Sequence, residues 1–206
     1  MAADIGRIVS ELISFRSLLG KRVLSVGAGG GQFVGLYREA REVVALDNDP
    51  SALDALRERV RSEGLENRVT PLLGDLLLLP EGENYDLLLF EFSLHEMGDP
   101  EEALKKACAI ASEVLVADHD PSSPWASLVG EGEKVARAWR GVRNRGALLE
   151  VAHGGEQIFS SKEELLRRVA PLGPEVQGNA RAWAEREGLR IPMVYRFALL
   201  KGLSGS

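Results

Sequence analysis

Short apolar runs recur along the first part of the chain, and their residues are apolar at nearly every position rather than at alternate ones. The runs cover 22–26, 43–46, 69–73, 86–90 and 113–117. Strands of this kind are buried on both faces, as in a parallel sheet that helices cover on both sides. Amphipathic segments lie between the runs, so the pattern predicts alternating strands and helices, which is the α/β class.

Helices are predicted between and around these strands, wherever apolar residues recur at helical spacing. The predicted helices cover 4–19, 32–40, 50–63, 101–110, 124–145, a segment that opens at 160–163, and 180–187. Aspartate–proline pairs at 49–50 and 99–100 start two of them, because aspartate caps a helix and proline fits its first turn. Residues 146–160 are predicted to be a connection that contains glycine, and 194–200 the final strand.

The chain has 206 residues, of which 45% are hydrophobic and 27% are charged, so we expect one globular domain. Its parts would be an N-terminal helix (1–20), a core (21–120), an insertion (121–160), and a C-terminal helix with the final strands (161–203). Cys108 is the single cysteine, which excludes an internal disulfide. With no signal-peptide pattern and no apolar run of membrane length, the composition indicates a cytoplasmic protein.

The net charge is −6, which gives no broad basic surface for nucleic acid. We therefore expect neither a nucleic-acid partner nor a membrane partner. A monomer and a homodimer both remain open, because the amphipathic first helix could pair two chains or cover the sheet.

Glycines at positions 27, 29 and 31 follow the first predicted strand. Such a turn needs backbone angles that side chains resist, and it lets a ligand approach the backbone closely. Asp47 ends the second strand, where a carboxylate can accept hydrogen bonds from both hydroxyls of a ribose. Gln32 stands where the dinucleotide fingerprint requires glycine or alanine, which favours a nucleoside-type ligand without a pyrophosphate. A purely structural glycine turn is the alternative.

Other motifs stand at the ends of the predicted strands, where an α/β sheet binds its ligands. With the glycine turn they are Val26-Gly27-Ala28-Gly29-Gly30-Gly31, Asp47, Gly74-Asp75, the stretch from Tyr85-Asp86 to Glu91, and Leu94-His95-Glu96-Met97 followed by Asp99-Pro100-Glu101-Glu102-Ala103-Leu104. With these motifs, residues 22–118 resemble a class I S-adenosylmethionine-dependent methyltransferase of the small methyltransferase-domain type. The resemblance implies a Rossmann-like, seven-stranded, mostly parallel sheet with helices on both faces, an antiparallel seventh strand, and a helical lid insertion before the last helix and strands.

The resemblance also implies where S-adenosylmethionine would bind and leave as S-adenosylhomocysteine. The cofactor contacts that it assigns are Gly27, Ala28, Gly29, Gly31, Asp47, Asn48, Gly74, Asp75, Leu76 and Glu91. Gly27 and Gly29 would underlie the methionine part of the cofactor, and Asp47 would hold the ribose. Asp75 would accept a hydrogen bond from the adenine amino group. Asn48 and Leu76 would flank the adenine ring. The family usually has an acid two positions before the first glycine, where this chain has Ser25. In the family this acid often helps to fix the glycine loop or the methionine ammonium, and the resemblance assigns no residue of this chain to that contact.

Methyl transfer from a sulfonium is a direct displacement, so the protein mainly supplies position and electrostatics. Where the acceptor must lose a proton, His119 and His95 are the candidate general bases, and His119 is the better one. Either histidine could instead be a hydrogen-bonded loop residue. We predict no metal site, although Glu91, Asp118 and Asp120 could offer oxygen ligands to Mg²⁺, with His95 or His119 completing a transition-metal set.

A small molecule is the expected acceptor, with the 121–160 insertion as its lid and pocket. Trp125, Trp139 and His153 could line that pocket, or the tryptophans could pin a helix to the core. Four arginines could recognise an acidic acceptor or form a solvated surface; they stand at 137, 140, 143 and 145.

Three other functions compete with small-molecule methyl transfer. An NAD(P)-binding oxidoreductase is disfavoured by Gln32 and by the Gly74-Asp75 pair. An RNA methyltransferase is disfavoured by the acidic net charge. A non-catalytic binder of S-adenosylmethionine is the third, and Ser25 would be one symptom of lost activity.

Overall fold

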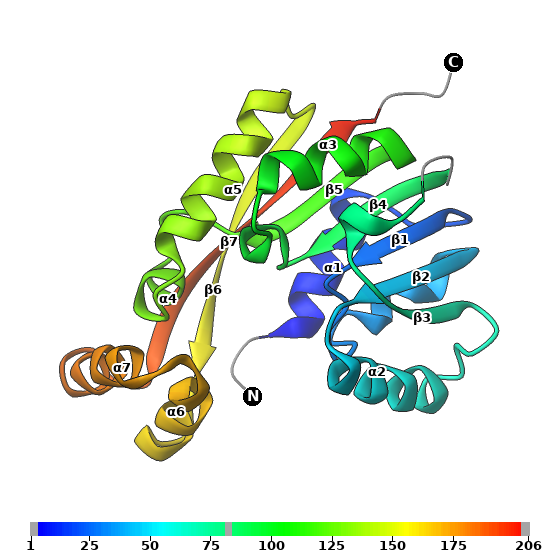
Figure 1. Ribbon diagram of the computed structural model, residues 1–206. Helices are drawn as coiled ribbons and strands as arrows, with labels where there is room; N and C mark the ends of the chain where they lie inside the picture. Colours follow the sequence, from blue (N-terminus) through cyan, green and yellow to red (C-terminus); the bar gives the residue numbers. More distant parts are fainter. Residues whose placement is uncertain (1–3, 81–83, 203–206) are drawn as a thin grey trace.

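The computed structural model describes residues 4–80 and 84–202. Its strands form one seven-stranded sheet in the order β3-β2-β1-β4-β5-β7-β6 (Figure 1). The strands are Arg22–Val26 (β1), Glu42–Asp47 (β2), Val69–Leu73 (β3), Tyr85–Glu91 (β4), Ala111–His119 (β5), Leu149–Ile158 (β6) and Arg190–Lys201 (β7). Strands β1 to β5 are parallel, and β7 runs antiparallel to both β5 and β6. The predicted Rossmann-like sheet is confirmed.

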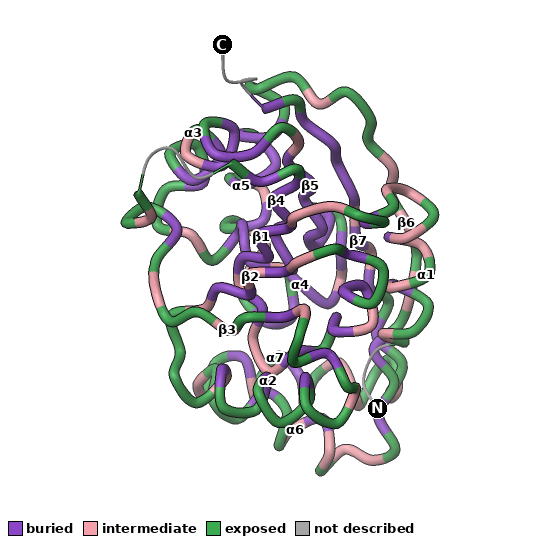
Figure 2. The backbone as a smooth tube through the Cα atoms, turned by 90° about the vertical axis from the view of Figure 1, so that its right-hand side faces the viewer, coloured by how far each residue is buried: buried purple, intermediate pink, exposed green. Residues whose placement is uncertain are grey.

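Each face of the sheet carries its own hydrophobic core. On β4, Leu87 and Leu89 pack into one core, whereas Leu88 and Phe90 pack into the other. The helices of the first core include α1 (Ile5–Phe15) and α2 (Pro50–Ser62), and those of the second include α3 (Pro100–Ile110) and α5 (Gly132–Arg145). Figure 2 shows buried strands between helices whose outer sides are exposed. Strands apolar at successive positions are what this arrangement requires, because neighbouring residues point to opposite faces.

Aspartate side chains start the helices that follow β2 and precede β5, as predicted. Asp49 accepts a hydrogen bond from the Ser51 amide at 2.8 Å. Asp99 accepts from the amides of Glu101 and Glu102 at 2.9 and 3.1 Å. Both helices have proline in the first turn, where its missing N–H costs no hydrogen bond.

Residues 149–158 form an edge strand, so the prediction of a connection at 146–160 is wrong. Strand β6 pairs with β7 along its whole length. Its residues alternate mostly between exposed and half-buried, because one face of this edge is open. The continuous apolar run that marked the other strands is therefore missing, and Gly154 and Gly155 favoured a loop.

Four predicted helices differ in type or extent, and the first of them, predicted over 4–19, ends already at Phe15. The predicted helix 124–145 is two helices, α4 (Pro124–Leu128) and α5, with Gly130 between them at a φ of +80°. Residues Val34–Glu39 form a 3₁₀ helix, η1, rather than an α-helix. Helix α7 (Pro174–Arg186) begins earlier than predicted. No helix in the described ranges has the length and apolar character that a membrane span requires.

A group of helices lies beside the carboxyl ends of the parallel strands (Figure 1). It consists of α6 (Lys162–Val169), η4 (Ala170–Leu172) and α7, which connect β6 to β7, and α4 contacts α7. Of the predicted insertion, helix α5 packs on the sheet and β6 joins it. The chain beside the carboxyl ends therefore comes mainly from the segment after β6.

Candidate functional site

A cavity of about 750 Å³ opens at the carboxyl ends of β1, β4 and β5. Residues 27–29 of the glycine turn form one wall, together with Glu91 and His119. Helix α6 lines the cavity with Arg167 and Arg168. This is the place where an α/β sheet binds its ligands, and it lies where the site was predicted.

The glycine turn needs its first two glycines for different reasons. Gly27 and Gly29 have φ angles of +73° and +52°, in the left-handed region that favours glycine. A Cβ on Gly27 would come within 2.2 Å of the Ser93 Cβ, whereas a Cβ on Gly29 would meet no atom within 4 Å. Gly27 therefore allows the turn to pack against the segment after β4, and Gly29 leaves open space on the cavity side.

No α-helix begins directly behind the glycine turn. The segment after it is the 3₁₀ helix η1, where the sequence predicts a helix over 32–40. Gly31 serves packing, since a Cβ there would come within 2.7 Å of the Leu56 side chain. Any ligand at this turn meets the backbone of residues 27–29 rather than a helix end.

Asp47 ties the glycine turn to the start of α2. Its Oδ2 accepts from the Gly29 amide at 2.7 Å, and its Oδ1 accepts from the Asp49 amide at 2.9 Å. A carboxylate has about four acceptor positions, so two remain for other donors. The ribose contact of Asp47 stays a prediction, and the structure adds a second role in shaping the loop.

Glu91 lies buried at the end of β4, next to the position where the resemblance expects an acid. Its Oε1 accepts hydrogen bonds from the Ser25 hydroxyl and, at 2.5 Å, from the Tyr37 hydroxyl. Its Oε2 is buried and has no hydrogen-bond partner among the described residues. Burial raises the pKa of Glu91 to about 7, although the two hydroxyls act in the opposite direction and the charge of Asp47 adds to the rise. The neighbouring strand therefore places a carboxylate beside Ser25, the position where the resemblance expects an acid.

Phe92 carries the one positive φ angle of a non-glycine residue in the described chain, at 51°. Its amide donates to the Ala117 carbonyl at 2.7 Å. Its ring stacks on Phe33 at 5.6 Å and meets the edge of His119 at 5.0 Å. A strained conformation at a strand end is typical of a binding site, and here it turns an aromatic ring into the cavity wall. The sequence carried no signal for this conformation.

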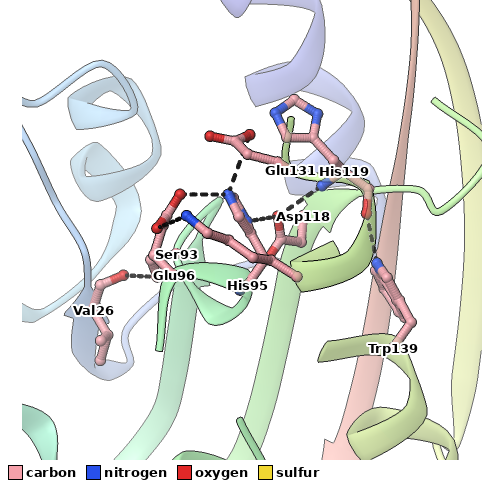
Figure 3. Close-up of polar contacts among 9 residues, drawn as sticks. Val26, Ser93, His95, Glu96, Asp118, His119, Glu131 and Trp139 are labelled. Atoms are coloured by element: carbon pink, nitrogen blue, oxygen red, sulfur yellow. Dashed lines mark hydrogen bonds and ion pairs between the residues drawn. The ribbon is translucent and has the colours of Figure 1, made fainter. Parts of the chain in front are cut away.

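His95 lies in the 3₁₀ helix η3 (Leu94–Glu96) and is fixed by Asp118 at the end of β5 (Figure 3). The His95 Nδ1 is 2.6 Å from Asp118 Oδ1, and the His95 amide donates to Asp118 Oδ2 at 3.0 Å. Burial lowers the pKa of His95, but hydrogen bonds and charge from Asp118 and Glu131 outweigh it and raise the pKa to about 10. This imidazole is therefore protonated at neutral pH, which makes it a poor general base.

His119 differs from His95 although both are buried. Its Nδ1 has no hydrogen-bond partner among the described residues, and burial lowers its pKa. Its carbonyl accepts from the Trp139 indole N–H at 2.5 Å, which fixes the backbone (Figure 3). The neutral ring lines the main cavity, so His119 is the better placed of the two predicted bases.

A second cavity of about 370 Å³ adjoins the first. It is lined by His95, Glu96 and Glu131, and it shares four lining residues with the main cavity: Phe92, His119, Trp125 and Arg168. The two histidines therefore face one connected space from different sides.

The residues predicted to hold the adenine lie at the ends of β2 and β3, outside the lining of the main cavity. They are Asn48, Asp75 and Leu76, and Gly74, a further predicted cofactor contact, precedes Asp75. The Asp75 carboxylate accepts from the Leu77 amide at 2.8 Å, and the Leu76 side chain is only 1% exposed. Their contacts with adenine remain predictions.

The alternative magnesium set is not assembled. Glu91 bonds to hydroxyls, Asp118 holds His95, and Asp120 is paired with Arg196 at 2.6 Å. Each of the three acids thus has its own partners, and they do not share a cation position.

Of the aromatic residues and arginines predicted to line the acceptor pocket, only some lie at a cavity. Trp125 lines both cavities, whereas Trp139 is fully buried and His153 pairs with Glu11. None of the four arginines of α5 lines either cavity. The arginines at the cavity are instead Arg167 and Arg168, which the sequence did not distinguish from other surface charges.

The family comparison agrees with this geometry. Residues 23–115 match the family model described as a methyltransferase domain. No curated protein matches the sequence.

Similar solved structures cover nearly the whole chain. The YcgJ protein from Bacillus subtilis has a TM-score of 0.65 and 15% identity over 98% of this chain and 98% of its own. A SAM-dependent methyltransferase from Aquifex aeolicus has a TM-score of 0.59 and 18% identity over 97% and 90%. The [4+2]-cyclase SpnF has a TM-score of 0.64 and 16% identity over 97% and 82%. Because the identities are only 15–18%, these similarities show the fold alone.

Proposed function

We propose that this chain, whose residues 23–115 match the methyltransferase domain family, is a class I S-adenosylmethionine-dependent methyltransferase that methylates a small molecule bound in the 750 Å³ cavity. The observation that carries the proposal is the unpartnered Oε2 of Glu91, buried beside the glycine turn. A buried carboxylate oxygen without a donor favours a ligand that brings one. We place the enzyme in the cytoplasm, as its composition indicates.

Glu91 would hold the methionine ammonium of the cofactor. The ammonium supplies both a positive charge and the donors that Oε2 lacks, which gives a charge-assisted hydrogen bond in a dry site. The methionine part of the cofactor would lie close to the backbone of residues 27–29, because Gly29 has no side chain and no other atom fills the space beside it. Asp47 would hold the ribose, and Asn48 with the segment 74–76 would hold the adenine.

The acceptor would carry an acidic group on an apolar body. Arg167 and Arg168 line the cavity, and Arg167 also interacts electrostatically with Glu163 and Glu164 on the same helix. A guanidinium binds a carboxylate or phosphate through paired hydrogen bonds. The other walls of the cavity include the aromatic rings of Phe92, Trp125 and Phe159, together with Gln157, Glu164 and Met193. Ligand pockets typically span roughly 300–1,000 Å³, so a cavity of about 750 Å³ suits small molecules better than a polymer.

Catalysis would rest on alignment, because the sulfonium supplies the reactive methyl group when it is bound. Holding two reactants in line can lower a barrier by about 7–11 kcal/mol. His119 would accept a proton where the acceptor must lose one, since its ring is neutral and its Nδ1 is unpartnered. His95 would stay protonated and would not act as the base.

A thermal-shift titration tests the cofactor assignment. S-adenosylmethionine or S-adenosylhomocysteine at a hundred times the dissociation constant adds about 2.7 kcal/mol, which raises the melting temperature by several degrees. NADH is the control ligand, and we expect no shift from it. A shift by NADH alone would identify an oxidoreductase, and no shift by any ligand would contradict the proposal. Radiolabelled methyl transfer to a panel of small carboxylates and phosphates then separates an enzyme from a non-catalytic binder, and transfer to RNA instead would contradict the small-molecule assignment.

A further inference from the structure

We propose that His95, Glu96 and Glu131 form a binding site for a divalent transition-metal ion beside the acceptor cavity. His95 and Glu96 belong to η3, after β4, whereas Glu131 precedes α5. The fold therefore brings the three side chains together from distant parts of the sequence (Figure 3). The proposal does not depend on methyl transfer, because it concerns a cation and these three ligands only.

The spacing of the ligand atoms fits a small metal ion. The His95 Nε2 lies 3.3 Å from Glu96 Oε1 and 3.5 Å from Glu131 Oε2. One ligand atom from each of the three residues lies within 4.8 Å of the others. Nitrogen and oxygen ligands about 2.0–2.2 Å from a tetrahedral ion are about 3.3–3.6 Å apart. Two edges of the tetrahedron are thus already formed, and the Glu96 side chain, which is 48% exposed, can close the third.

A buried carboxylate orients the imidazole as in metal sites. Asp118, which is fully buried, holds His95 Nδ1 at 2.6 Å and is itself fixed by the amides of His95 and His119. This leaves Nε2 as the ring nitrogen that faces the two glutamates. Carboxylate–histidine pairs of this kind set the tautomer and orientation of metal-binding histidines.

The carboxylates keep oxygens for the ion. Lys134 bonds to Glu96 through Oε2 at 2.8 Å, so the oxygen that faces His95 is the other one, Oε1. A divalent cation between His95 Nε2 and the two glutamates would bring positive charge to both carboxylates.

A second observation points to a ligand at this place. The site opens on the 370 Å³ cavity, which His119 lines as it does the main one, with its ring centroid 5.8 Å from that of His95. The His119 side chain is about nine-tenths buried, and its Nδ1 has no partner among the described residues. A buried polar atom without a partner favours an unassigned ligand. One imidazole and two carboxylates suit Zn²⁺, Mn²⁺, Fe²⁺ or Co²⁺ and leave coordination positions open toward the cavity.

Titration of chelator-treated protein with Co²⁺ alone tests the proposal, with visible absorption and calorimetry as readouts and no cofactor or acceptor present. We expect one ion per chain. Glu131→Gln and Glu96→Gln should each weaken its binding at least tenfold, and His95→Ala should abolish it. His153→Ala is the matched control, because His153 also pairs with a carboxylate, Glu11 at 3.2 Å, but away from the cluster. It should bind as the wild type does.

Two results would overturn the metal site: no saturable Co²⁺ binding by the wild type, or binding that the three cluster variants leave unchanged. Circular dichroism identifies a variant that fails to fold, and Glu96→Gln guards against that case, since its side chain is half-exposed. The failure of this test would leave cofactor binding untouched, because S-adenosylmethionine binding is measured separately on metal-free protein.

Discussion

Glu91 and Asp118 are buried carboxylates at the ends of neighbouring strands, yet their surroundings differ. Asp118 has the protonated His95 as its cation and two backbone amides as donors. Glu91 has only two hydroxyls, and one of its oxygens has no partner among the described residues. A buried charge needs a partner, so the first region is complete within the chain. The second region lacks a cation, and that difference indicates where a cationic ligand binds.

The largest expected effect comes from breaking the complete region. Asp118→Ala leaves the buried His95 imidazolium without its main partner, which should lower the free energy of unfolding by about 3–5 kcal/mol. Urea denaturation at pH 7 measures the loss. Glu58→Gln, exposed on α2, is the control and should change little. A loss below about 1 kcal/mol for Asp118→Ala would mean that the pair does not stabilise the fold as described.

The glycine turn gives the next effect, and two neighbouring glycines form the matched pair. Gly27→Ala combines a left-handed φ with a clash against Ser93, so we expect a loss of about 2–3 kcal/mol in unfolding free energy. Gly29→Ala has the strained φ without the clash and should lose about 1 kcal/mol. Equal losses in urea denaturation would contradict the distinction between a packing glycine and an open one.

The raised pKa of Glu91 predicts how pH changes stability. In the fold this carboxyl keeps its proton up to about pH 7, whereas in the unfolded chain it loses the proton near pH 4.5. Its contribution to stability is therefore complete below pH 4.5 and is lost as pH rises through 7. Glu91→Gln removes this loss, so relative to wild type it should gain on the order of 1–3 kcal/mol between pH 5 and pH 8. A difference between the two proteins that stays constant with pH would contradict the raised pKa.

The smallest effect concerns the acceptor. Arg168→Ala should raise the KM for an acidic acceptor about tenfold, or about 1.4 kcal/mol, with little change in stability. Arg140→Ala is the control, since Arg140 is exposed on α5 and lines neither cavity. Equal KM values for the two variants would contradict the proposal that the acceptor carries an acidic group.

Much of the fold could be predicted because buried parallel strands are apolar at successive positions. The same signal fails for β6, whose open face is polar and whose pairing comes only from β7. The end of the β1 strand also shows a limit. The family's acid is absent at Ser25, and the sequence does not indicate that the Glu91 side chain, from the adjacent strand β4, meets this serine.

The arginines show the same limit for the site. Two helix segments are rich in arginine, residues 137–145 and residues 167–168. Composition alone does not show which of them lies at the cavity. Only the placement of α6 beside the carboxyl ends brings Arg167 and Arg168 to the cavity. The sequence could place the glycine turn, Glu91 and His119 at one edge of the sheet because strand ends can be predicted from it, and all of them line the cavity.

Calorimetric titration of S-adenosylmethionine into wild type and Glu91→Gln, at pH 8 and at pH 5.5, tests the central claim that Glu91 receives the cation of the cofactor. At pH 8 we expect the variant to bind at least tenfold more weakly, because a charge-assisted hydrogen bond is worth about 1.5–3 kcal/mol. Wild-type affinity should fall from pH 8 to pH 5.5 as Glu91 takes up a proton, whereas the variant should bind equally at both values. Equal affinity of the two proteins at pH 8 would contradict the claim.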